Sequence, residues 1–224
     1  MISLPRLYAI VDSSSFSRTD ALVVYAQALV DGGCTLLQYR NKSGDARVML
    51  EQARELRRAC GLQSQNPHFS QNQREVGHPT DQSFRLIMND RADLCLAAEF
   101  DGVHVGQDDL SPEAVRRMIG SERWLGVSTH NPEQLCEADL TPADYLAIGP
   151  VFATTSKEKP DPVVGLEGVR RARQLTKKPL VAIGGLTRGN AASVIEAGAD
   201  SVAVISDLIR DPRKSAEEFL RILR

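Results

Sequence analysis

The sequence lacks the features that would place a protein in a membrane or outside the cell. No segment approaches the roughly 20 consecutive apolar residues that a membrane-spanning helix needs. The first residues, MISLPRLYAIVD, show no charged leader followed by a long apolar run, so we expect no secretory signal. These absences predict a cytoplasmic protein that does not associate with membranes.

A surplus of charge of one sign is also missing. The 27 basic and 29 acidic residues give a net charge of -2. Proteins that bind nucleic acid or anionic lipid through bulk electrostatics usually carry a basic face, so we expect neither partner. A local basic pocket for small phosphorylated substrates is compatible with this balance, and so is a homo-oligomer.

Paired cysteines are absent as well. The four cysteines, at positions 34, 60, 95 and 136, lie far apart and include no CxxC pair. Three of them fall in apolar segments, where a free cysteine behaves as a small hydrophobic residue. We therefore expect reduced thiols, most of them in the core, rather than metal or redox sites.

The chain instead has the length and rhythm of one α/β domain spanning residues 1–224. Its 224 residues are 42% hydrophobic and 25% charged, close in size to a (β/α)₈ barrel of roughly 250 residues. Short apolar runs alternate with amphipathic stretches, and eight such repeats favour a closed TIM barrel over an open doubly wound sheet, although alternation alone does not settle closure. The expected strands are Leu7–Val11, Thr35–Tyr39, Arg85–Met88, Gly102–Val105, Trp124–Val127, Tyr145–Ile148, Leu180–Ile183 and Ser201–Ile205.

Helix signals lie between these strands. Ser111, Asn131 and Asp211 each precede a proline, which predicts a capping side chain before the first helical turn. Glycines follow the helical stretches, as expected of C-terminal caps, at Gly32, Gly61, Gly120 and Gly198. The expected helices include Ala21–Val30, Ala46–Cys60, Pro112–Ile119, Ala191–Ala197 and Pro212–Leu223.

One segment, residues 62–84, interrupts this rhythm. It is rich in Gln, Asn, Pro and His and shows no hydrophobic period. We interpret it as an inserted, mobile loop between the second helix and the third strand. That connection belongs to the N-terminal face of a barrel, away from the catalytic face, so we expect His68 and His78 to be solvated rather than ligands.

Polar residues follow seven of the eight expected strands, where active sites of such barrels form. Arg40, Lys42 and Lys157 supply cations, and the Gly184-Gly185 pair allows backbone amides to approach a ligand. The loops after strands seven and eight, the latter opening at Ser206, are the usual place for a phosphate site in a barrel. The pattern therefore indicates phosphate chemistry, although a Gly-Gly pair also fits a plain turn.

Asp90 and Asp109 directly follow neighbouring strands. Two carboxylates beside cations and phosphate sites suit Mg²⁺, which typically takes one or two carboxylates plus phosphate oxygens. The alternatives are that Asp90 caps a helix, that Asp109 begins a turn, or that Asp108 is the ligand instead.

The remaining ring side chains have simpler explanations. His104 lies within a strand, and we interpret it as a packed or hydrogen-bonded core residue. His130 is nearer the rim, where it is either an acid–base group or part of the cap before Asn131. Trp124 begins a strand, and its simplest role is packing.

Together these motifs resemble the thiamine phosphate synthase family. The matching segments are QYRNK (38–42), ND (89–90), GVHVGQDDL (102–110), GVSTH (126–130), GPVFATTSK (149–157), AIGG (182–185) and VIS (204–206), which occur in the family's order. The chain departs from the family pattern in the 62–84 insertion, in Ala153 where proline is often found, and in Ser156 where threonine is common.

The resemblance implies a Mg²⁺-dependent transferase that joins 4-amino-2-methyl-5-(diphosphooxymethyl)pyrimidine to a thiazole phosphate or carboxythiazole phosphate, releasing diphosphate. It implies that Asp90 and Asp109 hold the metal. The implied pyrimidine diphosphate contacts are Gln38, Tyr39, Arg40, Asn41, Lys42, Asn89, Ser128 and Lys157, with Arg40, Lys42, Ser128 and Lys157 as the catalytic set. The implied thiazole phosphate contacts are Thr154, Thr155, Ser156, Gly185, Ile205 and Ser206.

Three other functions compete with this one. A related thiazole tautomerase would use His130 but would not need Asp90 and Asp109. A sugar-phosphate epimerase or isomerase would leave the GVHVGQDD segment unexplained, and a silent binding protein would not need a metal pair.

Overall fold

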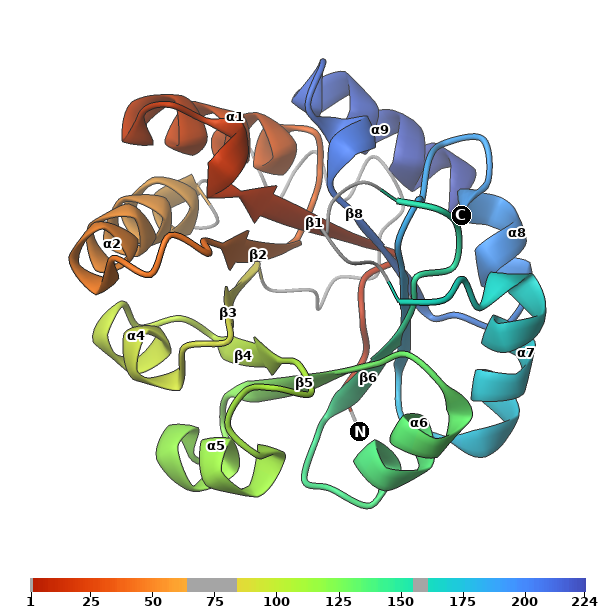
Figure 1. Ribbon diagram of the computed structural model, residues 1–224. Coiled ribbons are helices and arrows are strands. Elements are labelled where there is room, and N and C mark those ends of the chain that lie inside the picture. The colour runs from red at the N-terminus through yellow and green to blue at the C-terminus, as the bar shows by residue number, and fades with distance from the viewer. Residues whose placement is uncertain (1, 64–83, 155–160) are drawn as a thin grey trace.

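The computed structural model describes residues 2–63, 84–154 and 161–224. In this part of the chain, eight parallel strands close into a barrel in sequential order, and helices form an outer ring around it (Figure 1). The strands are β1 (Leu7–Asp12), β2 (Leu36–Arg40), β3 (Arg85–Asn89), β4 (Gly102–Val105), β5 (Trp124–Thr129), β6 (Tyr145–Ile148), β7 (Leu180–Ile183) and β8 (Ser201–Val204). The predicted (β/α)₈ barrel is confirmed.

The strands are apolar on both faces because each face packs against a separate core. Alternate side chains point into the barrel, where Tyr8, Leu36, Ile87 and Tyr145 belong to the inner cluster. The others point outwards into a larger cluster shared with the helices. Pairing of β1 with β8, in which Tyr8 lies opposite Ala203, closes the barrel.

Capping side chains begin three helices as the sequence predicted. Ser111, Asn131 and Asp211 accept hydrogen bonds from the backbone amides three residues on, and a proline follows each of them. Gly61 is different: it lies inside a helix rather than after one, so its prediction as a cap was wrong. The helices are α1 (Thr19–Asp31), α2 (Ala46–Gln63), α4 (Ala92–Ala97), α5 (Pro112–Ile119), α6 (Pro132–Asp139), α7 (Gly165–Leu175), α8 (Ala191–Glu196) and α9 (Pro212–Ile222), with short 3₁₀ helices η1 (Ser13–Ser15) and η2 (Ser206–Leu208).

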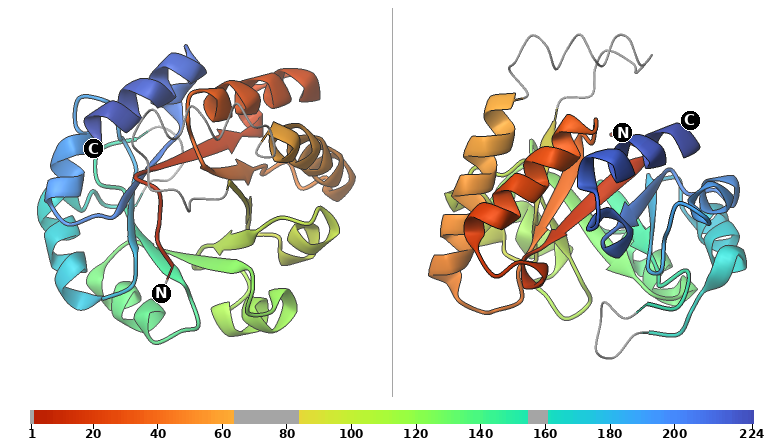
Figure 2. Two further views of the ribbon diagram at one scale, coloured as in Figure 1. Left: turned by 180° about the vertical axis from the view of Figure 1, so that it is seen from behind. Right: turned by 90° about the horizontal axis from the view of Figure 1, so that it is seen from above.

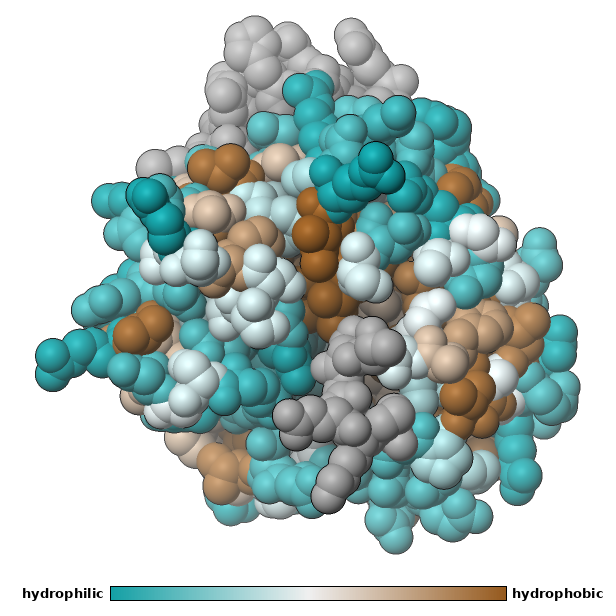
Figure 3. Space-filling view, turned by 45° about the horizontal axis from the view of Figure 1, so that its top comes forward, coloured by the Kyte–Doolittle hydropathy of each residue, from teal (hydrophilic) through white to brown (hydrophobic). Residues whose placement is uncertain are grey.

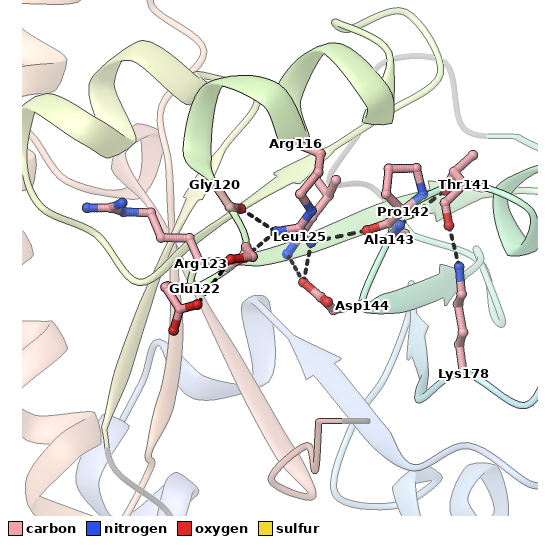
Figure 4. A network of polar contacts seen from close by, with 11 residues as sticks. Arg116, Gly120, Glu122, Arg123, Leu125, Thr141, Pro142, Ala143, Asp144 and Lys178 are labelled. Atoms are coloured by element: carbon pink, nitrogen blue, oxygen red, sulfur yellow. Dashed lines mark hydrogen bonds and ion pairs between the residues drawn. The ribbon is translucent and has the colours of Figure 1, made fainter.

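An aspartate–arginine clamp recurs at the N-terminal ends of the strands. Before β6, Asp144 accepts a hydrogen bond from the backbone amide of Leu125 at 2.7 Å and pairs with Arg116 of α5 at 2.6 Å (Figure 4). Asp101, before β4, and Asp200, before β8, make the same two kinds of contact. Each accepts a hydrogen bond from a backbone amide of the preceding strand and pairs with an arginine of the helix before that strand. Each clamp ties a helix to two neighbouring strands, at the end of the barrel away from the predicted site.

The chain termini also lie at this end of the barrel (Figure 2, right). The inserted segment predicted at 62–84 lies mostly outside the described residues, but α2 ends at Gln63 and β3 begins at Arg85, so it connects at the N-terminal end of β3. Among the described helices, none is long and apolar enough to cross a membrane. The cysteines are free thiols, and three of the four are buried, as predicted.

Candidate active site

Strand β2 directs its last side chains alternately inwards and outwards. Gln38 is buried inside the barrel, and Arg40 follows it on the same face. Tyr39 faces α2 and donates a hydrogen bond to Gln52 at 2.6 Å, and Asn41 donates to the same oxygen at 3.0 Å. The side chains of Tyr39 and Asn41 therefore hold β2 against α2, and a ligand contact by these two residues would have to come from the backbone.

Arg40 is held by an acid that the sequence analysis did not single out. Its guanidinium pairs with Asp12 at the end of β1. Asp12 is buried and also accepts hydrogen bonds from the amide of Ser14 at 3.0 Å and from its hydroxyl at 2.7 Å. The signal was present, because Asp12 ends a strand on the same rim as the predicted residues.

Asp90 sits in a strained backbone position directly after β3. Its φ of 64° is in the left-handed region, where non-glycine residues are uncommon and often functional. Its amide donates to the carbonyl of His104 at 2.8 Å, and its carboxylate pairs with the Lys42 ammonium at 2.5 Å. Burial raises the pKa of Asp90, Lys42 lowers it, and the carboxyl of Asp109 raises it again, for a net rise.

Asp109 therefore lies close to Asp90, as the sequence predicted for a carboxylate pair. One of its oxygens accepts from the amide of Gly106 at 2.7 Å, whereas Asp108 beside it is exposed. The described residues contain no group of three or more His, Cys, Asp or Glu side chains that would hold a metal by themselves. A cation here would need oxygen ligands from a substrate in addition to the two carboxylates.

Asn89 carries a buried donor that has no partner. Its side chain is 8% exposed, and no hydrogen bond reaches its Nδ2 within the described part of the chain. Such a group costs free energy unless a ligand or water satisfies it, so it indicates a binding position. Ser128, across the rim on β5, is 2.8 Å from Nε2 of His104 through its Oγ.

The two histidines of the motifs differ in their surroundings. His104 is buried between two hydroxyls, as predicted, and burial lowers its pKa to about 4. His130 has its Nδ1 2.6 Å from the carbonyl oxygen of Gly149 and its backbone amide bonded to Gln134. His130 is thus tied to the loop after β6 and to α6, consistent with the structural alternative.

The loops after β6, β7 and β8 pack against one another. Gly184 and Gly185 have φ values of 97° and 65°, and a Cβ on Gly185 would lie 2.5 Å from the carbonyl oxygen of Ala153. Arg188, in the β7 loop, pairs with Asp207 of η2 at 3.0 Å, and its amide donates to the same carboxylate at 2.8 Å. The glycines are therefore required by close approach of the loops, and Arg188 and Asp207, which the sequence analysis missed, fix the two loops together.

Comparisons with known proteins point to one family. A profile of the thiamine monophosphate synthase family matches residues 7–208. The chain belongs to this family. It is 57% identical to a thiamine-phosphate synthase of Koribacter versatilis over 99% of this chain and 97% of the relative, and 42% identical to one of Chloroflexus aurantiacus over 97% and 92%. A solved thiamine phosphate pyrophosphorylase of Pyrococcus furiosus is 32% identical, with a TM-score of 0.76 over 97% of this chain and 95% of that one.

Membership of the thiamine monophosphate synthase family confirms both the resemblance and the prediction of a transferase enzyme. In this barrel, the predicted residues on β2 to β5 and directly after them lie at the C-terminal ends of the strands. Gly185, Ile205 and Ser206 lie on the loops after β7 and β8. Thr154 is half-buried in the loop after β6. Thr155, Ser156 and Lys157 lie outside the described residues.

Figure 3 shows one face of the synthase barrel in space-filling form. It is mostly hydrophilic, with a narrow hydrophobic strip near its centre and further brown or tan groups elsewhere, the broadest of them on the right. Within the described part of the chain, the buried apolar residues form two clusters, one inside the barrel and one under the helices.

Proposed function

We propose that the protein couples 4-amino-2-methyl-5-(diphosphooxymethyl)pyrimidine to a thiazole phosphate, with or without a carboxylate, to give thiamine phosphate and diphosphate. The observation that carries this proposal is the unpartnered amide of Asn89 beside the Lys42–Asp90 ion pair and Asp109. A buried donor, a cation and a carboxylate pair at one place suit a diphosphate that arrives with a divalent cation.

The donor set fits Mg²⁺. Asp90 and Asp109 supply hard oxygen ligands, and Lys42, 54% exposed, can leave Asp90 to contact the diphosphate. When bound, Mg²⁺ would neutralise negative charge on the leaving diphosphate. Asp90 and Asp109 would hold it together with oxygen atoms of the substrate, because the described residues contain no group of three or more potential ligands.

The chemistry we propose is dissociative. The bond from the pyrimidine methylene carbon to the diphosphate oxygen breaks, and its electron pair leaves with diphosphate, whose charge Arg40, Lys42 and Lys157 would balance. The electron-rich aminopyrimidine supports the cationic methylene carbon. The thiazole nitrogen then forms the new carbon–nitrogen bond with its lone pair, so no side-chain nucleophile is needed. Gln38 and Ser128, one on each side of the rim, would orient the pyrimidine ring.

The second substrate would bind at the loops after β6 to β8. Gly185, Ile205 and Ser206 would contact its phosphate, together with Thr154, Thr155 and Ser156. The contacts between Arg188 and Asp207 support a preformed position for the loops after β7 and β8, because these two loops are already fixed to each other before a ligand binds. We also infer that the enzyme acts in the cytoplasm on small molecules, and that it binds neither nucleic acid nor membranes.

Product analysis tests this proposal against its rivals. Incubation with Mg²⁺, the pyrimidine diphosphate and either form of the thiazole phosphate should yield thiamine phosphate by mass spectrometry, and the faster thiazole identifies the natural one. Isomerisation of the thiazole without coupling would instead identify a tautomerase. Binding of both substrates without any product would identify a silent binding protein.

A further inference from the structure

Five polar side chains form one hydrogen-bond chain across the inside of the barrel. The Nε2 of Gln38 donates to the hydroxyl of Tyr8 at 2.8 Å, and that hydroxyl lies 3.0 Å from the hydroxyl of Tyr145. The Tyr145 oxygen is 3.2 Å from Nδ1 of His104, whose Nε2 is 2.8 Å from Oγ of Ser128. The chain joins β2, β1, β6, β4 and β5, and its two ends are the residues proposed to orient the pyrimidine.

The three middle members are enclosed by the barrel. Tyr8, Tyr145 and His104 are 1%, 0% and 7% exposed. Gly126 of β5 makes room for them, because a Cβ there would collide with the rings of Tyr145 and His104. Enclosure by the barrel disfavours the charged forms of these groups, so the hydroxyls keep their protons and the imidazole is neutral.

In a hydrogen-bond chain of neutral groups, each group donates its proton to the next one, so all the hydrogen bonds run in one of only two directions. A neutral imidazole has one donor nitrogen and one acceptor nitrogen, and each hydroxyl has one proton to give. Because the amide nitrogen of Gln38 faces Tyr8, the Tyr8 proton is left for Tyr145, and the Tyr145 proton for Nδ1 of His104. His104 then carries its proton on Nε2 and donates it to Ser128.

We propose that Tyr8, Tyr145 and His104 are positioning residues that fix the hydrogen-bonding polarity of the pyrimidine site. In this direction the chain leaves Oε1 of Gln38 as an acceptor and the hydroxyl proton of Ser128 as a donor. Within the described part of the chain no hydrogen bond reaches that Gln38 oxygen. In the opposite direction, with the amide turned over, Gln38 would present donors and Ser128 an acceptor.

The proposed polarity matches an aminopyrimidine edge. An amino group donates and a ring nitrogen accepts, so an acceptor at Gln38 and a donor at Ser128 complement them, whereas the opposite direction would set donor against donor. This match rests on the proposed function, but the direction of the chain itself does not. The two can therefore fail separately.

The tautomer of His104 tests the direction without any substrate. In two-dimensional nitrogen–proton spectra of histidine-labelled protein, the His104 ring should appear as the Nε2–H tautomer, assigned by its loss in His104→Asn. An Nδ1–H tautomer would overturn the proposed direction, whether or not the protein makes thiamine phosphate. A synthase-inactive protein with the Nε2–H tautomer would instead overturn the proposed function alone.

Tyr145→Phe tests the positioning role. It removes the central hydroxyl, so Tyr8 loses its acceptor and His104 its donor. The KM for the pyrimidine diphosphate should rise about tenfold, with the KM for the thiazole phosphate unchanged. The matched control is Tyr25→Phe, because Tyr25 is also buried and its hydroxyl has no partner among the described residues. This control should leave both KM values as they are.

Unchanged KM values in a folded Tyr145→Phe, or equal effects on both substrates, would overturn the positioning role. If thermal unfolding shows that Tyr145→Phe is not folded, Tyr8→Phe is measured in its place, because it breaks the same hydrogen-bond chain next to Gln38. The same rise in the KM for the pyrimidine diphosphate alone is expected, and the same two results would contradict it.

Discussion

Asp90 combines backbone strain, partial burial and an ion pair in one residue. Its left-handed backbone is stabilised by the hydrogen bond from its amide to the His104 carbonyl. Its carboxylate is 19% exposed and shares its surroundings with Asp109, which is unfavourable for two negative charges unless a cation lies near. Lys42 supplies that cation now, and a bound metal ion would replace it. Strain and like charge at one residue are typical of a site built for a ligand rather than for stability.

Asp90→Asn removes the negative charge at this position and keeps the size and shape of the side chain. Asparagine tolerates the left-handed backbone, so the fold should be retained. Loss of one carboxylate from the proposed metal site should lower kcat by about 10²- to 10³-fold and raise the Mg²⁺ concentration needed for half-maximal rate. Asp93→Asn is the control, since Asp93 lies nearby but forms an exposed pair with Arg91. Near-normal rates of Asp90→Asn at limiting Mg²⁺ would contradict the metal assignment.

The sequence indicated the position of a residue at the rim where that residue follows a strand, but it did not indicate contacts with a partner that is distant in the chain. Asp90 and Asp109 were found because parallel strands end at one rim. The sequence did not show that the side chains of Tyr39 and Asn41 point outwards to α2, because successive side chains of β2 alternate in direction and the sequence does not show which of them point into the barrel. Arg188 was missed because its partner Asp207 lies 19 residues further on.

At the scale of elements, local signals predicted most of the boundaries. Five of the eight strands differ from their predicted bounds by one or two residues. Four of these five extend further than predicted, because the polar residue that ends a strand still pairs with its neighbour. Gly61 was taken for a helix end, but α2 continues to Gln63. The aspartates before β4 and β8 were not singled out, because their arginine partners lie 44 and 27 residues away.

The clamp before β6 should contribute measurably to stability. Asp144→Ala removes the acceptor of the Leu125 amide and the partner of Arg116. Loss of two charge-assisted hydrogen bonds that are largely shielded from water should lower the free energy of unfolding by about 2–3 kcal/mol. Urea denaturation measures this. Asp93→Ala, which breaks an exposed ion pair, should cost at most about 1 kcal/mol. Equal losses in the two variants would show that the clamp is no stronger than a surface pair.

At the scale of the whole molecule, the barrel separates stability from chemistry. The three clamps and the connection between α2 and β3 lie at the N-terminal ends of the strands, and the candidate site lies at the C-terminal ends. The hydrogen-bond chain through Tyr8, Tyr145 and His104 lies inside the barrel below this rim. Closure itself was favoured but not decided by the sequence, because pairing of β1 with β8 joins residues almost 200 positions apart.

The inserted segment should therefore be dispensable for activity. Replacing residues 64–83 with a short glycine–serine linker leaves α2 and β3 complete. We expect kcat and both KM values within about twofold of the full chain, because loop length at a distant connection affects stability only weakly. Steady-state kinetics with both substrates measures this, and thermal unfolding checks the fold. Complete loss of activity in a folded variant would refute the placement of this segment away from the site.

Measurement of diphosphate release shows whether the residues at this rim catalyse a metal-assisted coupling of two phosphorylated substrates. The purified protein is incubated with the pyrimidine diphosphate and Mg²⁺, with and without the thiazole phosphate, and each mixture is repeated with EDTA. Thiamine phosphate and diphosphate should form in equal amounts only when the thiazole phosphate and Mg²⁺ are both present. Absence of diphosphate release from folded protein that still binds the thiazole phosphate, or full release in EDTA, would contradict the proposed coupling.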